Sequence, residues 1–313
     1  MTRKSRFDFP ETQVIRVQDG KEEKYYDDDD EYEDEDYEEE DDDDEEEYVQ
    51  RHHRPVRRKR RLSRGGRAIL RIILAISIAV AGYSGFQLYM GLKEYRESEN
   101  AYEALAGENA SEGSETVATE EGQVLQYEKV NFEALAAINS DVAGWLSLEG
   151  TVINYPIVHG TDNEYYLEHL FNKETNHTGC IFIDADNAGD FSDKNTAMYA
   201  HHMRNGSMFA ELENYREQSY YDSHKELVLQ TPNGTYLIQP FAGILTDGYA
   251  DYIRLSFGST EEFLSFVDEV RSQSTFQSDV EVLMTDRIVT MSTCRYDVEN
   301  GRYAVFGKLV PID

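Results

Sequence analysis

A single uncharged stretch constrains this chain more than any other feature. The 21 residues from Ile72 to Leu92 (IILAISIAVAGYSGFQLYMGL) contain no Asp, Glu, Lys or Arg. As an α-helix rising about 1.5 Å per residue, the stretch spans the roughly 30 Å hydrocarbon core of a bilayer. It therefore predicts one transmembrane helix, and the chain that follows it is the part able to bury a core.

Two alternatives for this stretch are weaker. Ala79-Val80-Ala81 resembles the cleavage site of a signal peptide, but the charged region before it is too long and the apolar stretch exceeds the usual ~7 to 15 residues. A buried core helix of a soluble protein does not explain the flanking arginines. We therefore expect an uncleaved signal anchor.

Charge before the stretch predicts its orientation. Residues 51–71 carry ten Lys or Arg side chains. Taken alone they form a patch that attracts any phosphate, including that of nucleic acid. Beside a membrane span, however, they bind anionic lipid heads and keep the N-terminus in the cytoplasm, so that the C-terminal region lies outside the cell.

The first 50 residues are dominated by acid. From Asp27 to Glu47 every residue is Asp or Glu except Tyr32 and Tyr37. Such a run repels itself and buries nothing apolar, so residues 1–50 are predicted to be a disordered cytoplasmic tail. A solvated tail is the simpler interpretation, and a docking segment for a basic partner is the alternative.

Beyond the span, residues 93–126 are rich in Glu, Ala, Ser, Gly and Asn and predict a flexible acidic linker. Residues 127–313 are predicted to form the folded domain. Residues 93–313 together hold 14 basic and 38 acidic side chains, and 14 − 38 gives a net charge of −24. This balance does not favour nucleic acid as a substrate.

The folded region alternates short strands with turns, which predicts a mostly β fold, a barrel with peripheral helices. Strands are expected at 144–147, 152–158, 180–184, 196–201, 227–230, 235–245, 287–293 and 303–310. Helices are expected at 131–140 with Asn131 as N-cap, at 163–170, and at 260–273 with Thr260 as cap and an apolar face of Phe263, Phe266, Val267 and Val270.

Two of these strands end in reactive side chains, Cys294 after VTMST and His201 after TAMYA. A thiol is a strong nucleophile only as thiolate, which a neighbouring cation such as imidazolium favours. Arg302, on the run that follows, is always charged and donates several hydrogen bonds, as an oxyanion requires. The pattern is typical of a cysteine nucleophile with a proton partner and an oxyanion donor.

These residues resemble the sortases, the membrane-anchored cysteine transpeptidases of Gram-positive bacteria. The T-L-x-T-C motif of sortases reads TMSTC here, with Met291 in place of leucine. DVAGWLSLEGTVINYPIVHGTDNEYYL (141–167) and YAHHMRNGSMFAEL (199–212) are similar to class B sortases. The resemblance extends from Tyr127 to Asp313 and implies a sortase-type β-barrel.

The resemblance also implies a two-step acyl transfer. Cys294 attacks a carbonyl of a sorting-signal peptide, Arg302 stabilises the oxyanion, and His201 protonates the leaving amine. An amine of a peptidoglycan precursor or a pilin then takes the acyl group. Ser292 and Thr293, which precede the nucleophile, are predicted to contact the peptide, and no cofactor or metal is expected.

Rival residues exist for the histidine and the arginine. His202 points to the opposite strand face from its neighbour, and the sortase pattern selects His201, directly after Tyr199-Ala200. Arg295 follows the cysteine immediately and leaves on the other face, so Arg302 is preferred. The remaining extracellular histidines have no reactive neighbour in the sequence and receive no role: His159, His169, His177 and His224.

Two further features receive simple interpretations. Cys180 lies in an apolar run and is predicted to be a buried thiol, with a disulfide to Cys294 as the alternative. The loop 184–190 half-resembles a calcium loop but has Asn195 where the closing glutamate belongs, so a polar turn is preferred.

Two other function classes stay open. One is a cysteine peptidase that uses the same residues with water as the acceptor. The other is a non-enzymatic membrane organiser that acts through the charged cytoplasmic tail.

Overall fold

A computed structural model describes residues 64–109, 113–118, 124–248, 250–294 and 300–312. The predicted acidic tail at 1–50 and the first part of the basic segment lie outside these ranges. So does Arg295, the rival of Arg302.

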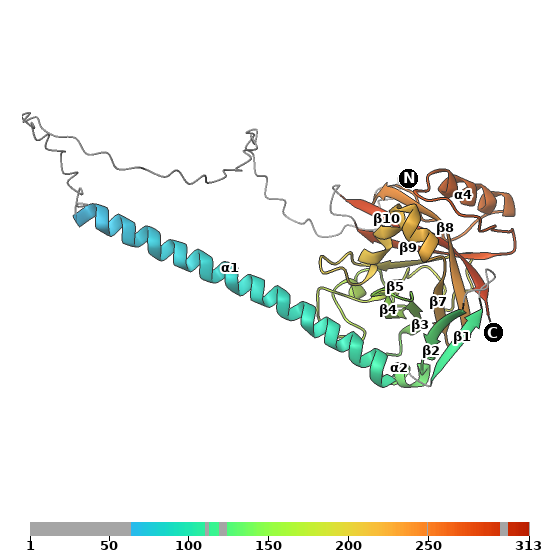
Figure 1. The fold of residues 1–313 in the computed structure, drawn as a ribbon, viewed down its shortest axis with the longest axis horizontal. Coiled ribbons are helices and arrows are strands. Elements are labelled where there is room, and N and C mark those ends of the chain that lie inside the picture. Colours follow the sequence, from blue (N-terminus) through green and yellow to red (C-terminus); the bar gives the residue numbers. More distant parts are fainter. Residues whose placement is uncertain (1–63, 110–112, 119–123, 249, 295–299, 313) are drawn as a thin grey trace, which may run out of the picture. The chain divides into compact units, whose positions relative to one another are not determined.

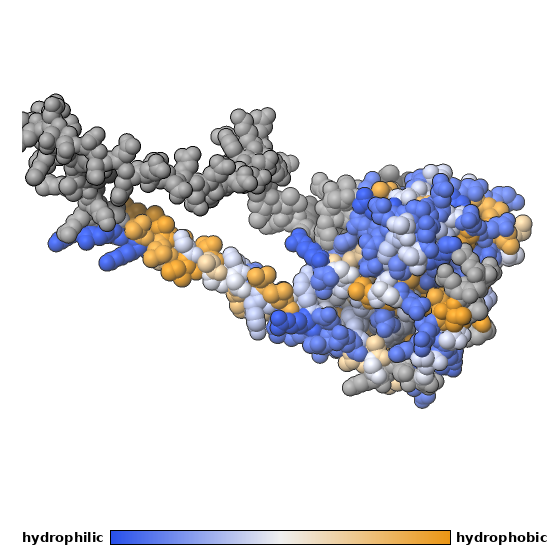
Figure 2. Space-filling model, viewed as in Figure 1, coloured by the Kyte–Doolittle hydropathy of each residue, from blue (hydrophilic) through white to orange (hydrophobic). Residues whose placement is uncertain are grey.

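A long helix, α1 (Arg64–Ala104), begins the described chain and contains the predicted membrane span. Of the helices that the structure describes, α1 alone is long and apolar enough to cross a membrane. Large apolar side chains from Ile69 to Leu92 are exposed on it, and Figure 2 shows this stretch in orange. A π-helical turn, Leu105–Asn109, follows.

Eight strands close into a barrel in the order β10-β8-β7-β3-β4-β5-β6-β9 (Figure 1). The pairs β4–β5 and β6–β9 are parallel, and the other neighbours are antiparallel. The predicted β-barrel is therefore confirmed, and each expected strand is present. The bounds are β3 Val142–Ser147, β4 Asn154–Val158, β5 Ile181–Ile183, β6 Asn195–Ala200, β7 Leu227–Thr231, β8 Gly234–Asp247, β9 Arg287–Cys294 and β10 Gly301–Pro311.

Short elements lie around the barrel. A hairpin of two antiparallel strands precedes it, and helical segments connect several of its strands. They are β1 Ser114–Ala118, β2 Val124–Glu128, α2 Phe132–Ile138, the 3-10 segments η2 Tyr165–Leu167 and η3 Phe209–Arg216, α3 Gln218–Ser223, and α4 Thr260–Ser272.

Alternation along the strands places their side chains in separate apolar clusters. Met291, Tyr303 and Val305 belong to the large cluster that fills the barrel. Ala304 and Phe306, which alternate with Tyr303 and Val305 on β10, face the other way. They belong with Phe266 of α4 to a second cluster on the outer face. The predicted apolar face of α4 is thus buried against β8 and β10.

The N-cap of α2 is the residue predicted from the sequence, whereas the N-cap of α4 is a different residue. Asn131 caps α2 by accepting a hydrogen bond from the Ala134 amide (2.9 Å), as predicted. The cap of α4 is Ser259, whose side chain accepts from the Glu262 amide, rather than Thr260. Thr260 is instead the first residue of the helix.

The largest difference from the sequence analysis lies in the predicted flexible linker, 93–126. There α1 continues to Ala104 with Ser98 and Tyr102 buried, and the hairpin of β1 and β2 follows. The reason is tertiary, because the two side chains are covered by the loop before β5, about 80 positions away in sequence.

The helix predicted at 163–170 is also shorter than expected. It is only the single turn η2, because the next residues pair with a later segment: His169 forms a β-bridge with Thr175.

Candidate active site

The ends of three neighbouring strands bring the predicted reactive residues to one edge of the barrel. β6 runs parallel to β9, with Ala200 opposite Thr293. β10 runs antiparallel to β9, with Arg302 opposite Cys294. His201 directly follows β6, so positions 201, 294 and 302 are adjacent across three strands. Backbone register alone produces this juxtaposition.

His201 is held mainly by backbone. Its Nε2 lies 2.7 Å from the Leu167 carbonyl oxygen, and because a carbonyl only accepts, Nε2 carries the proton. The ring of His177 lies 5.3 Å from that of His201. Burial lowers the pKa of His201 below its ordinary value, His177 adds to this effect, and the bond to Leu167 and the charge of Glu168 oppose it.

Arg302 is only 6% exposed, which is unusual for a guanidinium. Its Nη1 donates a hydrogen bond to the Gly301 carbonyl at 3.0 Å. In register, the residue stands between Cys294 of β9 and Thr246 of β8. A permanent positive charge is therefore fixed beside the end of the cysteine strand.

The two residues before the cysteine are buried. Ser292 is 3% exposed, and its hydroxyl lies 2.8 Å from that of Tyr252. Thr293 is 2% exposed and faces the other side of the strand. Neither hydroxyl lies on the surface of the structure, so the peptide contact predicted for them stays a prediction.

Comparison with known proteins decides the family. A family model of the sortase domain matches residues 146–310. The chain is 33% identical over 250 residues to sortase B of Staphylococcus aureus, and 32% identical over 247 residues to sortase B of Listeria monocytogenes. Each match covers 78% of this chain and 96% of the relative. The chain belongs to the sortase family.

The fold of this sortase agrees with that assignment. A solved Staphylococcus aureus sortase B–substrate complex matches it with a TM-score of 0.60 and 31% identity, over 71% of this chain and all of that one (100%). The protein is therefore a cysteine transpeptidase similar to sortase B. The family, the fold and the enzyme class expected from the sequence are confirmed.

The second cysteine of the sortase is unlike a nucleophile. Cys180 is free and 2% exposed, and its sulfur lies 3.6 Å from the Pro156 carbonyl oxygen. Burial raises the pKa of this thiol to about 12, so it stays protonated at neutral pH. The structure thus has a buried thiol here, as predicted, and not the alternative disulfide.

The acidic loop 184–190 of the sortase is joined to the strand of the histidine. Asp184 is fully buried, and its Oδ2 accepts a hydrogen bond from the Tyr199 hydroxyl at 2.8 Å. Its Oδ1 accepts from the Asp186 amide at 3.0 Å, as in a polar turn. Because Tyr199 lies two residues before His201, this bond anchors the end of β6.

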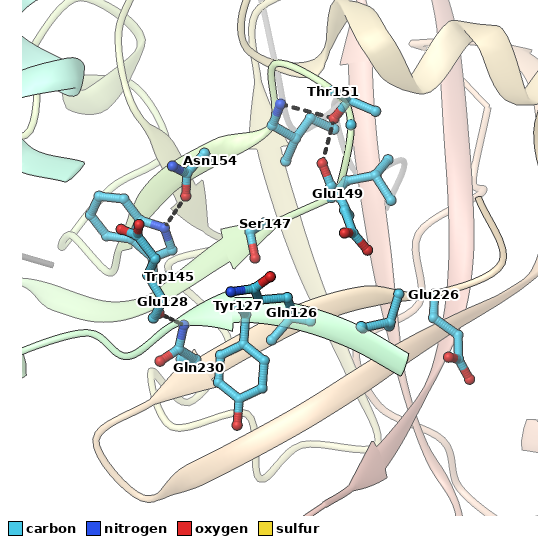
Figure 3. A pocket seen from close by; sticks show the side chains of 15 residues that line it. Gln126, Tyr127, Glu128, Trp145, Ser147, Glu149, Thr151, Asn154, Glu226 and Gln230 are labelled. Atoms are coloured by element: carbon cyan, nitrogen blue, oxygen red, sulfur yellow. Dashed lines mark hydrogen bonds between the residues drawn. The ribbon is translucent and has the colours of Figure 1, made fainter. Parts of the chain in front are cut away.

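A hollow in the sortase lies elsewhere, on strands that are not neighbours of β9 (Figure 3). It contains none of the five predicted site residues. Its lining comes mainly from β2, β3, β7 and the turn before β4: Leu125, Gln126, Tyr127, Glu128, Trp145, Ser147, Leu148, Glu149, Gly150, Thr151, Ile153, Asn154, Glu226, Val228 and Gln230.

Sequence reasoning missed three groups beside the sortase site. The Leu167 carbonyl gives no sequence signal, because every residue has one. His177 received no role because it is 24 positions from His201 in the chain. Tyr252 lies in a loop whose path the strand pattern does not predict.

Proposed function

We propose that this sortase cleaves a sorting-signal peptide through a thioacyl intermediate and transfers the acyl group to an amine. The thiolate of Cys294 attacks a backbone carbonyl, and the tetrahedral intermediate expels the amine of the next residue as the C–N bond breaks. The amine of the second substrate then attacks the thioester, forms a new amide and releases the thiolate.

His201 and Arg302 divide the remaining work in this proposal. His201 gives its proton to the leaving amine and takes one from the incoming amine. Because burial lowers its pKa, the imidazolium is a stronger acid than a free histidine. Arg302 supplies hydrogen bonds to the oxyanion from a buried position that needs little reorganisation.

The observation that supports the proposal best is the register of β6, β9 and β10. Three residue types that acyl transfer requires lie at adjacent ends of neighbouring strands, although 93 positions separate the histidine from the cysteine. The family of the chain independently supports transfer rather than an unrelated cysteine chemistry.

The proposal includes the orientation of the chain in the membrane and the identity of the amine acceptor. The ten basic residues at 51–71 favour a cytoplasmic N-terminus, which leaves the barrel outside the cell. There an amine of a peptidoglycan precursor or a pilin is the acceptor. A solved sortase B is described as a complex with triglycine, which recommends that peptide as the amine to test.

The test uses the full chain in detergent with a panel of sorting peptides, with and without triglycine. Mass spectrometry is expected to find an acyl adduct on Cys294, and triglycine is expected to divert product from the free acid to the amide. Cys294→Ala should abolish both, whereas Cys180→Ala, the matched control, should retain them. Product that remains acid at every triglycine concentration would support the hydrolytic peptidase instead.

A further inference from the structure

The last turns of α1 are fastened to the loop at 172–179. The Tyr102 hydroxyl donates to the Gly179 carbonyl at 2.6 Å, and Thr178 Oγ1 donates to Ser98 Oγ at 3.0 Å. Asn176 Nδ2 donates to the Glu94 carbonyl at 3.1 Å. All four side chains involved are at most 5% exposed. Buried hydrogen bonds of this kind are costly to leave unmade, so they fix the loop on the helix.

This loop lies directly against the backbone that binds His201. Gly179 has a positive φ of 64°, and a Cβ there would lie 2.8 Å from the Leu167 carbonyl oxygen and 2.5 Å from that of Tyr166. Only glycine allows so close an approach. The Cys180 amide also donates to the Tyr166 carbonyl at 2.9 Å. Gly179 is therefore packed directly against the backbone of η2.

The next contacts reach His201 itself. The Leu167 carbonyl at the end of η2 accepts from His201 Nε2, and the ring of His177, carried by the same loop, lies 5.3 Å from the His201 ring. A continuous path of short contacts thus runs from Tyr102 through Gly179 and Leu167 to His201. It contains backbone carbonyls and one buried hydroxyl rather than long flexible side chains.

We propose that Tyr102 and Ser98 are positioning residues for the transfer reaction: by clamping loop 172–179, the end of α1 fixes the Leu167 carbonyl and the His177 ring against His201. The inference rests on the role of His201 stated above. It assigns a function to the end of α1, a segment whose composition predicts a linker. Neither Tyr102 nor Ser98 touches the substrate in this scheme.

Loosening the clamp should change His201 in a defined direction. The groups around His201 are the Leu167 carbonyl of η2, Glu168 directly after η2, and His177 from the loop, and positions 294 and 302 are its neighbours in strand register. Burial is the largest cause of its lowered pKa. Release of η2 and the loop weakens the Leu167 bond, which raises the pKa, but it also admits water and removes the larger effect of burial, so the pKa should rise towards its ordinary value.

The experiment compares the full chain in detergent with Tyr102→Phe and Ser98→Ala. Each variant is expected to lower kcat about tenfold, with KM nearly unchanged, because a general acid is misplaced while the peptide site is intact. The pH profile of kcat and the His201 pKa, measured by NMR on isotope-labelled histidine, should both shift upward. Tyr95→Phe is the control, since Tyr95 lies seven residues earlier on the same helix and, within the described residues, no hydrogen bond joins its hydroxyl to the loop.

The outcomes separate the clamp from general stability and from the proposed reaction. Lower thermal stability with an unchanged pH profile and His201 pKa would overturn the inference. If Tyr102→Phe does not fold, Ser98→Ala decides in the same way. If wild-type chain forms no adduct on Cys294 but the His201 pKa still rises in the variants, the clamp is supported and the proposed reaction fails.

Discussion

At the scale of single residues, His201 is held by a carbonyl rather than by a carboxylate, and this choice affects stability. Its pKa lies below the ordinary 6.5, with burial as the main cause. The unfolded chain, with its ordinary pKa, therefore binds a proton first as the pH falls. The contribution of neutral His201 to the free energy of unfolding is complete above about pH 6.5. It is lost as the pH falls from that value through the lower pKa of the folded state.

This direction of the pH dependence gives a prediction for His201→Gln, which removes the titrating group. The free energy of unfolding of the wild type minus that of the variant should be constant above about pH 7 and fall as the pH drops below about 6.5. Urea titrations followed by the fluorescence of Trp145, the single tryptophan, measure both curves. A difference that rises as the pH falls would contradict the account.

At the scale of elements, α4 stabilises the strands that carry the site by covering their outer face. Phe266 is 1% exposed, and its ring lies 5.8 Å from Phe306 of β10 and 5.5 Å from Phe257. Phe266→Ala is expected to cost about 3–5 kcal/mol, because a large cavity opens between helix and sheet. Ser265→Ala, on the exposed face of the same helix, should change the free energy of unfolding by less than about 0.5 kcal/mol in the same urea titrations.

The same helix shows what the sequence predicts well. The apolar residues of α4 follow the 3.6-residue period, so one face is visible without knowing its partner. In η3 the buried Phe209, Leu212 and Tyr215 are spaced by three, and no expected helix matches that period. The buried end of α1 is composed like a linker, and only the distant Gly179 and its loop explain why it is ordered.

The candidate site likewise contains residues that the sequence predicts and groups that it does not. Cys294, His201 and Arg302 are predictable because each ends or begins a strand-like run, and neighbouring strands bring such positions together. The Leu167 carbonyl is not predictable, since backbone groups carry no residue-specific signal. His177 lies on a loop whose path depends on α1.

At the scale of the whole molecule, charge and chemistry are segregated along the chain. The full sequence has a net charge of −32, and residues 93–313 account for −24 of it. The residues proposed for transfer, and the contacts that hold them, all come after Lys93. Nothing in this chemistry requires the acidic run at 27–47, whereas a membrane organiser that acted through its tail would depend on it.

Deletion of residues 1–50 tests this division. The shortened chain keeps the basic segment, α1 and the barrel, so kcat and KM for peptide and triglycine should stay within about twofold of the full chain, as for a change far from the reacting groups. Reactions in detergent measure the chemistry, and reactions in vesicles with anionic lipid measure any effect of the tail on the basic segment. A loss of turnover in detergent would show that the tail takes part in the reaction itself. Unchanged turnover in both detergent and vesicles would confine the tail to a role outside the transfer step. The barrel edge and the clamp formed by the end of α1 would then be sufficient for the transfer reaction.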